Sequence, residues 1–194
     1  LTEGTDIAHY VVGDNTFEVS QKSFWQSHKD APITLTKAVL EYAETREGDQ
    51  VLDLYGGVGL FTAALLPLVG ESGSVDLVEG SKFATSDAGR NFAGSKNVNI
   101  VTGDVAKVIT RFPRADVVVL DPPREGTGKD VIENLARIAP RTIVYVACDP
   151  AALARDTAYL RDAGYELDAI RAFDLFPMTH HIECIAKFIP SKVS

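Results

Sequence analysis

Cysteine, methionine and tryptophan are scarce in this 194-residue sequence, which holds two, one and one of them. The two cysteines, Cys148 and Cys184, are too few for the disulfide framework of a small secreted protein, so we expect a reducing, cytoplasmic compartment. Long hydrophobic runs are also lacking. Apolar runs such as residues 143–148 and 117–120 fall far short of the about 20 residues that cross a bilayer, so we expect no membrane partner.

Positive charge is in short supply as well: 19 basic residues against 27 acidic ones leave a net charge of −8. This argues against a sequence-independent grip on nucleic acid over the whole surface, which needs clustered Lys and Arg. A local patch or another domain could still hold nucleic acid. The hydrophobic share of 45% and the charged share of 24% are typical of a globular chain and exclude a disordered or collagen-like protein. Because the chain starts at Leu1 without Met, we expect it to be a piece of a longer protein.

The N-terminal part of the chain has a different sequence pattern from the rest. Short β-prone runs at residues 10–12 and 16–19 flank Gly13-Asp14-Asn15, which predicts a hairpin. Residues 33–47 are predicted to form a helix, because apolar residues recur near a 3.6-residue period. Gly48 is predicted to end this helix.

From residue 50 on, apolar strands alternate with helical segments, so we expect a main domain of residues 49–190 behind a hairpin and helix extension of residues 1–48. Strands rich in Val, Ile and Leu that alternate with helices predict a parallel sheet covered on both faces. The last two strands are joined by a loop, which favours an antiparallel pair at an edge. The expected fold is therefore α/β, a Rossmann-like, doubly wound, mostly parallel seven-stranded sheet. Its predicted strands are residues 51–55, 74–79, 98–102, 116–121, 142–148, 165–173 and 182–188.

Polar side chains follow five successive strands of this predicted sheet. Ligands of an open parallel sheet bind beyond the carboxyl ends of the strands, so these side chains should converge on one crevice. Each of the acidic ones alone could simply cap a helix, because Asp favours that position. The whole set in register is what indicates a binding site. Its members are Asp53 with Tyr55, Glu79, Asp104, Asp121 and Cys148.

The first strand runs into a glycine-rich loop, Gly56-Gly57-Val58-Gly59, which can turn tightly and approach a ligand or can be a plain strand-to-helix turn. Gly57 and Gly59 fit the start of the dinucleotide pattern G-x-G-x-x-G, but Thr62 stands at its last position. Glu79 follows Gly59 by 20 residues, where a carboxylate can accept hydrogen bonds from ribose hydroxyls. The loop therefore indicates a nucleoside ligand, and leaves open whether it is a nicotinamide cofactor or another adenosine-containing molecule.

Two further segments at this edge of the sheet contain residues that could take part in catalysis. In Asp121-Pro122-Pro123-Arg124 the prolines stiffen the loop and fix where the Asp points. The loop is similar to the (Asp/Asn)-Pro-Pro-aromatic loop of methyltransferases that act on exocyclic amino groups, but Arg124 replaces the aromatic residue, which counts against that class. Cys148 stands near the start of a helix, whose N-terminus would lower the pKa of the thiol and favour the reactive thiolate. Inert packing is the usual role of a free cysteine, and we assign it to Cys184.

The remaining candidates are weaker. Adjacent His180 and His181 in an extended segment would point to opposite faces, so we expect no metal site there. Glu183 is a surface carboxylate by default, and it becomes interesting only if the preceding loop folds over the crevice. Arg124 and Arg155 could contact phosphate, or they could be solvated surface charges.

In combination, several segments resemble the RNA 5-methyluridine methyltransferases, the uracil-5 enzymes of tRNA and 23S rRNA. The resemblance covers roughly residues 17–188, and the order of the motifs makes it more specific than any one of them. It implies a class I S-adenosylmethionine-dependent methyltransferase fold and methylation of carbon 5 of a uridine in RNA. The segments are Phe24-Trp25-Gln26 and residues 53–61, 121–126, 146–156 and 174–183.

The resemblance also implies roles for individual residues. Cys148 matches the nucleophile that adds to carbon 6 of the uracil, and Glu183 matches the general base. Leu60 and Ala147 depart from the family pattern without touching the thiol or the base. Because members usually carry an N-terminal OB-type domain, we expect RNA to be gripped mainly by a domain outside this chain. The residues that match positions for binding S-adenosylmethionine are Gln26, Tyr55, Glu79, Asp104 and Asp121.

Three other functions stay open at this point. A methyltransferase acting on an amino group or a small molecule would not need Cys148. A nicotinamide dehydrogenase would bind NAD and not S-adenosylmethionine. A non-catalytic nucleoside- or RNA-binding domain would bind ligand without forming a covalent adduct.

Overall fold

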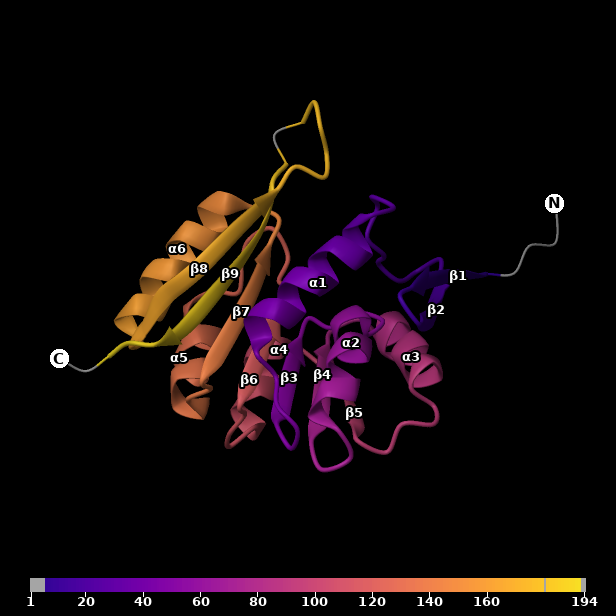
Figure 1. Ribbon diagram of the computed structural model, residues 1–194, viewed down its shortest axis with the longest axis horizontal. Helices are drawn as coiled ribbons and strands as arrows, with labels where there is room; N and C mark the ends of the chain where they lie inside the picture. Colours follow the sequence, from indigo (N-terminus) through magenta and orange to yellow (C-terminus); the bar gives the residue numbers. More distant parts are fainter. Residues whose placement is uncertain (1–5, 180, 193–194) are drawn as a thin grey trace.

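A twisted seven-stranded sheet forms the centre of the computed structural model, which describes residues 6–179 and 181–192 (Figure 1). The strand order is β5-β4-β3-β6-β7-β9-β8. The first five strands of this order are parallel, and β9 runs antiparallel to both β7 and β8. The predicted doubly wound sheet with an antiparallel edge is therefore confirmed. The strands are β3 (Gln50–Leu54), β4 (Ser74–Glu79), β5 (Val98–Thr102), β6 (Val117–Leu120), β7 (Thr142–Ala147), β8 (Tyr165–Phe173) and β9 (Glu183–Pro190).

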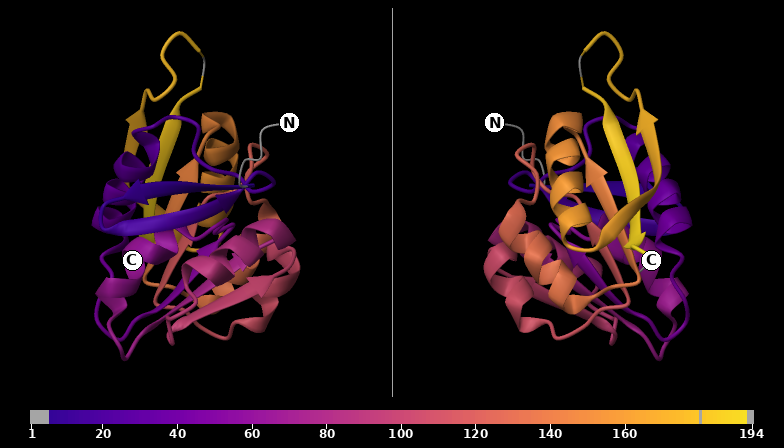
Figure 2. Two further views of the ribbon diagram at one scale, coloured as in Figure 1. Left: turned by 90° about the vertical axis from the view of Figure 1, so that its right-hand side faces the viewer. Right: turned by 90° about the vertical axis from the view of Figure 1, so that its left-hand side faces the viewer.

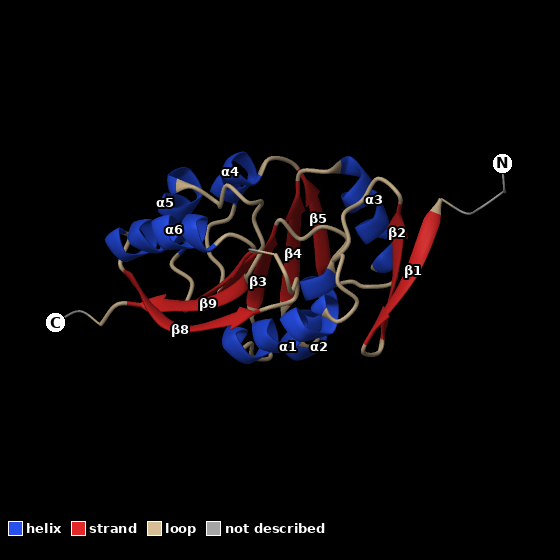
Figure 3. Cartoon of the chain, turned by 90° about the horizontal axis from the view of Figure 1, so that it is seen from above, coloured by secondary structure: helices blue, strands red, loops and turns tan. Residues whose placement is uncertain are grey.

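Helices cover both faces of the sheet, because successive strand residues alternate between two apolar cores. Val117 and Val119 face the core under α1, α2 and α3, whereas Val118 and Leu120 face the core under α4, α5 and α6. Seen from above, α1 and α2 lie on one side of the strands and α4 to α6 on the other (Figure 3). The helices are α1 (Ala31–Ala43), α2 (Leu60–Val69), α3 (Lys82–Asn91), α4 (Val105–Val108) with the 3-10 turn η1 (Ile109–Arg111), α5 (Lys129–Ile138) and α6 (Pro150–Asp162).

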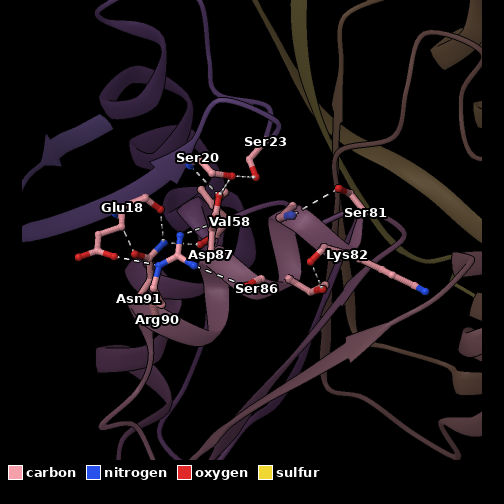
Figure 4. Close-up of polar contacts among 12 residues, drawn as sticks. Glu18, Ser20, Ser23, Val58, Ser81, Lys82, Ser86, Asp87, Arg90 and Asn91 are labelled. Atoms are coloured by element: carbon pink, nitrogen blue, oxygen red, sulfur yellow. Dashed lines mark hydrogen bonds and ion pairs between the residues drawn. The ribbon is translucent and has the colours of Figure 1, made fainter. Parts of the chain in front are cut away.

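The predicted N-terminal hairpin is also confirmed, as the antiparallel pair β1 (Ile7–Val12) and β2 (Asn15–Ser20). Figure 4 shows how β2 is attached to α3: the backbone N–H and the hydroxyl of Ser20 both donate to Asp87, at 2.8 and 2.9 Å. The N–H of Glu18 donates to Asn91, whose amide donates in turn to the carbonyl of Val58. The hairpin is therefore fixed to the helix that flanks the glycine-rich loop. The division into residues 1–48 and 49–190 stays a prediction.

The predicted end of the first helix is wrong. Helix α1 ends at Ala43, and Glu44 follows in the left-handed region with φ +46°. Arg141 donates a hydrogen bond of 3.0 Å to the carbonyl of Glu44, so a side chain from the loop before β7 satisfies this helix terminus. Gly48 lies in the following turn, with φ +85°.

The carboxyl ends of the parallel strands share one edge with the β8–β9 loop, which stands beyond the sheet in Figure 2. Strand order reverses between β3 and β6, and such a switch point is where open α/β sheets bind ligands. Among the described residues, no helix is both long and apolar enough to cross a membrane.

Candidate active site

A cavity of about 630 Å³ opens at the carboxyl edge of the sheet, within the size range of small-molecule sites. The structure brings to it all seven residues that the sequence analysis singled out for catalysis or cofactor binding. Phe24, Ser81 and Arg124 are further lining residues. Asp53 and Asp149, in contrast, do not line the cavity. The seven residues are Gln26, Tyr55, Glu79, Asp104, Asp121, Cys148 and Glu183.

The glycine-rich loop and Glu79 form one wall of the cavity. Backbone N–H groups of Gly57 and Ser81 donate to the two carboxylate oxygens of Glu79, at 3.0 and 2.6 Å. These bonds hold the carboxylate at the end of β4. Gly59 has φ +98°, and a Cβ there would lie 2.2 Å from the ring of Phe92, so only glycine fits. The loop can therefore pack closely against the end of α3.

Asp53 supports this wall from inside the sheet. Its side chain is fully buried and accepts hydrogen bonds from the N–H and the hydroxyl of Thr62, at 3.0 and 2.6 Å. Burial raises the pKa of Asp53 to about 6, because desolvation disfavours the charged carboxylate. Asp53 thus holds the first turn of α2 behind the glycine-rich loop.

Asp104 both caps a helix and lines the cavity, so the two interpretations of an acidic residue at a strand end do not exclude each other. Its side chain accepts a hydrogen bond of 3.2 Å from the N–H of Lys107 and so caps α4, and the same residue lines the cavity. Asp149, in contrast, caps α6 without lining the cavity.

Tyr55 directly precedes the glycine-rich loop and has a strained backbone conformation, with φ +61°. Non-glycine residues in this region cluster at functional sites. The Tyr55 hydroxyl lies 3.0 Å from the hydroxyl of Thr127, which belongs to the loop after Asp121. Thr127 therefore links Tyr55 to the segment that carries the two prolines.

A fully buried carboxylate, Asp156 on α6, orders that loop. It accepts hydrogen bonds from the hydroxyl of Tyr145 at 2.7 Å and from the N–H of Thr127 at 2.8 Å. The guanidinium of Arg155 pairs with its other oxygen at 2.8 Å and donates to the carbonyl of Glu125. Arg155 is thus a structural residue here. Nothing in the sequence pattern had singled out Asp156, Tyr145 or Thr127.

We expect Asp156→Asn to destabilise the protein by about 2–3 kcal/mol, because it weakens several hydrogen bonds to one buried charge. It should also lower the affinity of the cavity for an adenosine-containing ligand, because the loop that holds Tyr55 loses its anchor. Chemical denaturation and calorimetry measure the two effects. Asp162→Asn is the matched control, since Asp162 is an exposed carboxylate on the same helix. Equal stability of the two variants would contradict this account.

Cys148 follows β7 and is half-buried at the cavity. The predicted lowering of its pKa is wrong. Burial raises the pKa of the Cys148 thiol, and the carboxylates of Glu183 and Asp121 raise it further. The helix N-terminus does not offset this, because Asp149 already accepts the N–H groups of Ala151 and Ala152. In the ligand-free protein the thiol is therefore the favoured form.

Glu183 and Asp121 are acidic side chains in the same part of the cavity. Glu183 begins β9, is 9% exposed, and has its pKa raised by burial. Burial also raises the pKa of Asp121 to about 8, with the neighbouring charges of Glu183 and Asp53 acting in the same direction. Asp121 is therefore mainly a neutral acid at pH 7, and it can donate a hydrogen bond.

Iodoacetamide should alkylate Cys148 faster in Glu183→Gln than in the wild type at pH 8. A negative carboxylate disfavours the neighbouring thiolate, so removing its charge lowers the pKa of Cys148 and raises the thiolate fraction. Mass spectrometry of the alkylated peptide gives the rate. Glu125→Gln, an exposed carboxylate outside the cavity lining, should leave the rate unchanged. An unchanged rate in Glu183→Gln would refute the electrostatic coupling.

The β8–β9 loop contacts two other segments near the cavity. The ring of His181 contacts the guanidinium of Arg124, with nitrogen–nitrogen distances of 2.5 and 2.9 Å. Phe176 meets the rings of His28 and His181 edge-on, both at 6.2 Å between centroids. Arg124 thus ties the proline loop to the segment before Glu183. His180 lies outside the described residues, and no group of metal-ligating side chains occurs among the residues described.

Comparisons with known proteins relate this geometry to methyltransferases. The family model described as tRNA (uracil-5-)-methyltransferase matches residues 107–188, which include Asp121, Cys148 and Glu183. The model described as protein-L-isoaspartate(D-aspartate) O-methyltransferase matches residues 5–136 and stops before Cys148. The second match therefore covers the cavity wall formed by the glycine-rich loop and Glu79, but it covers neither Cys148 nor Glu183.

Curated relatives described as uncharacterized RNA methyltransferases are 49% identical over 91% of this chain in Streptomyces avermitilis and 47% identical over 92% in Streptomyces coelicolor. The chain spans only 41% and 39% of the lengths of these relatives. Their descriptions name RNA methyltransferases.

Solved structures that resemble this chain include methyltransferases as well. The tRNA (uracil-54, C5)-methyltransferase of Pyrococcus abyssi, in complex with S-adenosyl-L-homocysteine, superposes with a TM-score of 0.81 at 30% identity, over 96% of this chain and 45% of that one. TYW2 of M. jannaschii, in complex with AdoMet, shares the fold alone, with a TM-score of 0.70 at 17% identity over 98% of this chain and 89% of that one. The chain therefore has the class I methyltransferase fold and is related to RNA methyltransferases, among them the tRNA (uracil-5-)-methyltransferases.

Proposed function

We propose that this protein methylates RNA with S-adenosylmethionine as the methyl donor, and that the target is carbon 5 of a uridine. One observation carries the proposal: Cys148 and the buried Glu183 face the same cavity as Glu79 and Asp104. A nucleophile and a base thus lie where a nucleoside-containing cofactor can reach the same substrate. Methyl transfer to an amino group or an oxygen would not need this thiol.

The cavity wall fits S-adenosylmethionine. Glu79, held by two backbone N–H groups, presents a carboxylate that can accept hydrogen bonds from ribose hydroxyls. Ala84 and Val105 line the cavity beside it and offer apolar surface to an adenine ring. When bound, the cofactor supplies the methyl group and a positive sulfonium charge. We assign cofactor binding to Gln26, Tyr55, Glu79, Asp104 and Asp121.

Carbon 5 of uracil is a weak nucleophile, and a thiolate added at carbon 6 makes it carbanion-like. We assign this addition to Cys148. Carbon 5 then takes the methyl group, Glu183 removes the proton from carbon 5, and the bond from Cys148 to carbon 6 breaks to release the thiolate. Asp121, protonated at neutral pH by its raised pKa, can donate a hydrogen bond to the uracil edge as negative charge develops there.

The raised pKa of Cys148 has a place in this scheme. Burial and the neighbouring charge of Glu183 keep the thiol protonated while the cavity holds no cation. A sulfonium charge in the same cavity would act in the opposite direction and favour the thiolate. The arrangement couples thiol activation to cofactor binding.

RNA as the substrate fits the family of relatives, and the target uridine must leave its base stack to reach this cavity. The expected RNA-binding domain outside this chain stays a prediction. The net charge of −8 favours such a second contact, because this chain offers few cations for the RNA backbone.

Tritium release from RNA labelled at carbon 5 of uracil tests the proposal. With S-adenosylmethionine the wild-type protein should release tritium, because methylation replaces the hydrogen at carbon 5. Without the cofactor no sustained release is expected. RNA from cells that lack this protein is the substrate, so that the target uridine is unmodified. Methyl transfer to RNA without tritium release would exclude carbon 5 of uridine.

A second candidate, methyl transfer to a protein carboxyl group, is favoured only by the family match to residues 5–136. That reaction would leave Cys148 without a role. Labelled S-adenosylmethionine incubated with an isoaspartyl peptide and with RNA separates the two. Base-labile incorporation into the peptide would support the second candidate.

A further inference from the structure

A second cavity, of about 670 Å³, lies between the turn of the β1–β2 hairpin and the start of α1. It shares Gln26 with the candidate active site, and Phe24, which neighbours Trp25, lines that site too. The two cavities therefore adjoin at Gln26. A chain-like substrate held in the first cavity can therefore continue into the second.

Aromatic side chains form one wall of this second cavity. The rings of Tyr10 and Trp25 stack with centroids 4.6 Å apart and an interplanar angle of 20°. Trp25 also contacts the buried ring of Phe17 at 5.3 Å, which holds it in place. Tyr10 is 38% exposed and so keeps surface for another planar group. Such a platform suits a nucleobase, since every base can stack on an aromatic ring.

The polar lining points to the same ligand. Gln26, Ser27 and Lys29 supply hydrogen-bond donors, and Lys29 supplies a positive charge. No acidic side chain lines this cavity among the described residues, whereas Glu79, Asp104, Asp121 and Glu183 line the candidate active site. A phosphate group is therefore repelled less in the second cavity than in the first.

The aromatic wall is also fixed relative to the active site. The bonds from β2 to Asp87 and Asn91 attach the hairpin to α3, and Asn91 donates to Val58 in the glycine-rich loop (Figure 4). A binding surface gains affinity when its groups are held in place before the ligand arrives. The hairpin meets this condition.

We propose that the second cavity binds the nucleotide next to the target uridine in the RNA strand. Its base stacks on the Tyr10–Trp25 pair, and its phosphate lies near Lys29. This subsite rests on the proposed function, because it assumes that the RNA base enters the cavity of Cys148. It gives the catalytic chain its own hold on RNA, independent of any other domain.

Affinity for RNA of different lengths tests the subsite. The probes are uridine monophosphate and a single-stranded pentanucleotide with one central uridine, both measured with S-adenosylhomocysteine present. Tyr10→Ala should weaken pentanucleotide binding between about fivefold and 100-fold, the range for losing one stacked base. Its affinity for uridine monophosphate and for S-adenosylhomocysteine should not change. Tyr10→Phe should restore pentanucleotide binding.

His9→Ala is the matched control, because His9 is exposed on the same strand and does not line the cavity. A pentanucleotide with 4-thiouridine beside the central uridine should crosslink to the peptide of Tyr10 or Trp25. Equal pentanucleotide affinity in Tyr10→Ala and wild type would overturn the subsite.

The tritium assay keeps the two proposals distinguishable. Tritium release without Tyr10-dependent binding would overturn the subsite and keep the proposed function. Tyr10-dependent binding without tritium release would support the RNA subsite and contradict methylation at carbon 5.

Discussion

Cys148→Ala is expected to reduce cofactor-dependent tritium release from uracil-labelled RNA by at least about a thousandfold, the scale on which loss of a catalytic nucleophile acts. The reason is chemical: without the thiolate, carbon 5 of the uracil never becomes carbanion-like. The affinity for S-adenosylhomocysteine should stay near that of the wild type. Calorimetry checks this second point, and it separates lost chemistry from lost folding.

Cys184→Ala is the matched control for that variant. Cys184 is 5% exposed in β9 and faces the core under α4 to α6, so its loss should cost some stability and leave the activity near normal. If Cys148→Ala kept a tenth of the wild-type tritium release, the covalent mechanism would be wrong. The methyltransferase assignment of the chain would stand.

Glu183→Gln is expected to trap the enzyme on its RNA. Addition of Cys148 and methyl transfer do not require this carboxylate, but removal of the carbon 5 proton does. A methylated RNA–protein adduct should therefore accumulate and survive a denaturing gel, and turnover should fall by about 10²–10⁴-fold. Combining Glu183→Gln with Cys148→Ala should abolish the adduct.

The pH dependence of turnover gives an independent view of Glu183. A base acts only when it is ionised, and burial raises the pKa of Glu183 above the usual range of a glutamate. Turnover should therefore increase with pH through that raised pKa, and Glu183→Gln should lose this limb of the profile. An unaltered pH profile, or turnover without adduct, would assign the base to another residue.

Local sequence patterns predicted most of the fold. Strands β4, β5 and β8 have the predicted bounds, because alternation and branched residues are properties of each segment alone. The hairpin was predicted from the turn residues 13–15 alone. The end of α1 was not predicted correctly, because the side chain that satisfies Glu44 comes from Arg141, 97 positions away. A signal local to Gly48 could not reveal that contact.

Part of the candidate site was predicted from the sequence, and part of it was not. Motif order and strand-end positions identified seven residues that the structure brings to one cavity. Five of them lie at or just beyond the ends of parallel strands, which share one edge of the sheet. The Asp156 network was missed, since a buried Asp within a helix looks like any surface Asp in a sequence. Its role depends on Tyr145 and Thr127, which reach it from β7 and the proline loop.

By itself, the sequence determined the fold class and the edge of the sheet at which the thiol and the carboxylates of the candidate site lie. The tertiary structure alone decided their protonation. Cys148 has a raised pKa because the fold buries its thiol and places Glu183 and Asp121 beside it, while Asp149 occupies the helix N-terminus expected to lower that pKa. The sequence specifies the chemical type of each side chain, but the pKa of that side chain depends on its burial and on the charges near it in the folded protein.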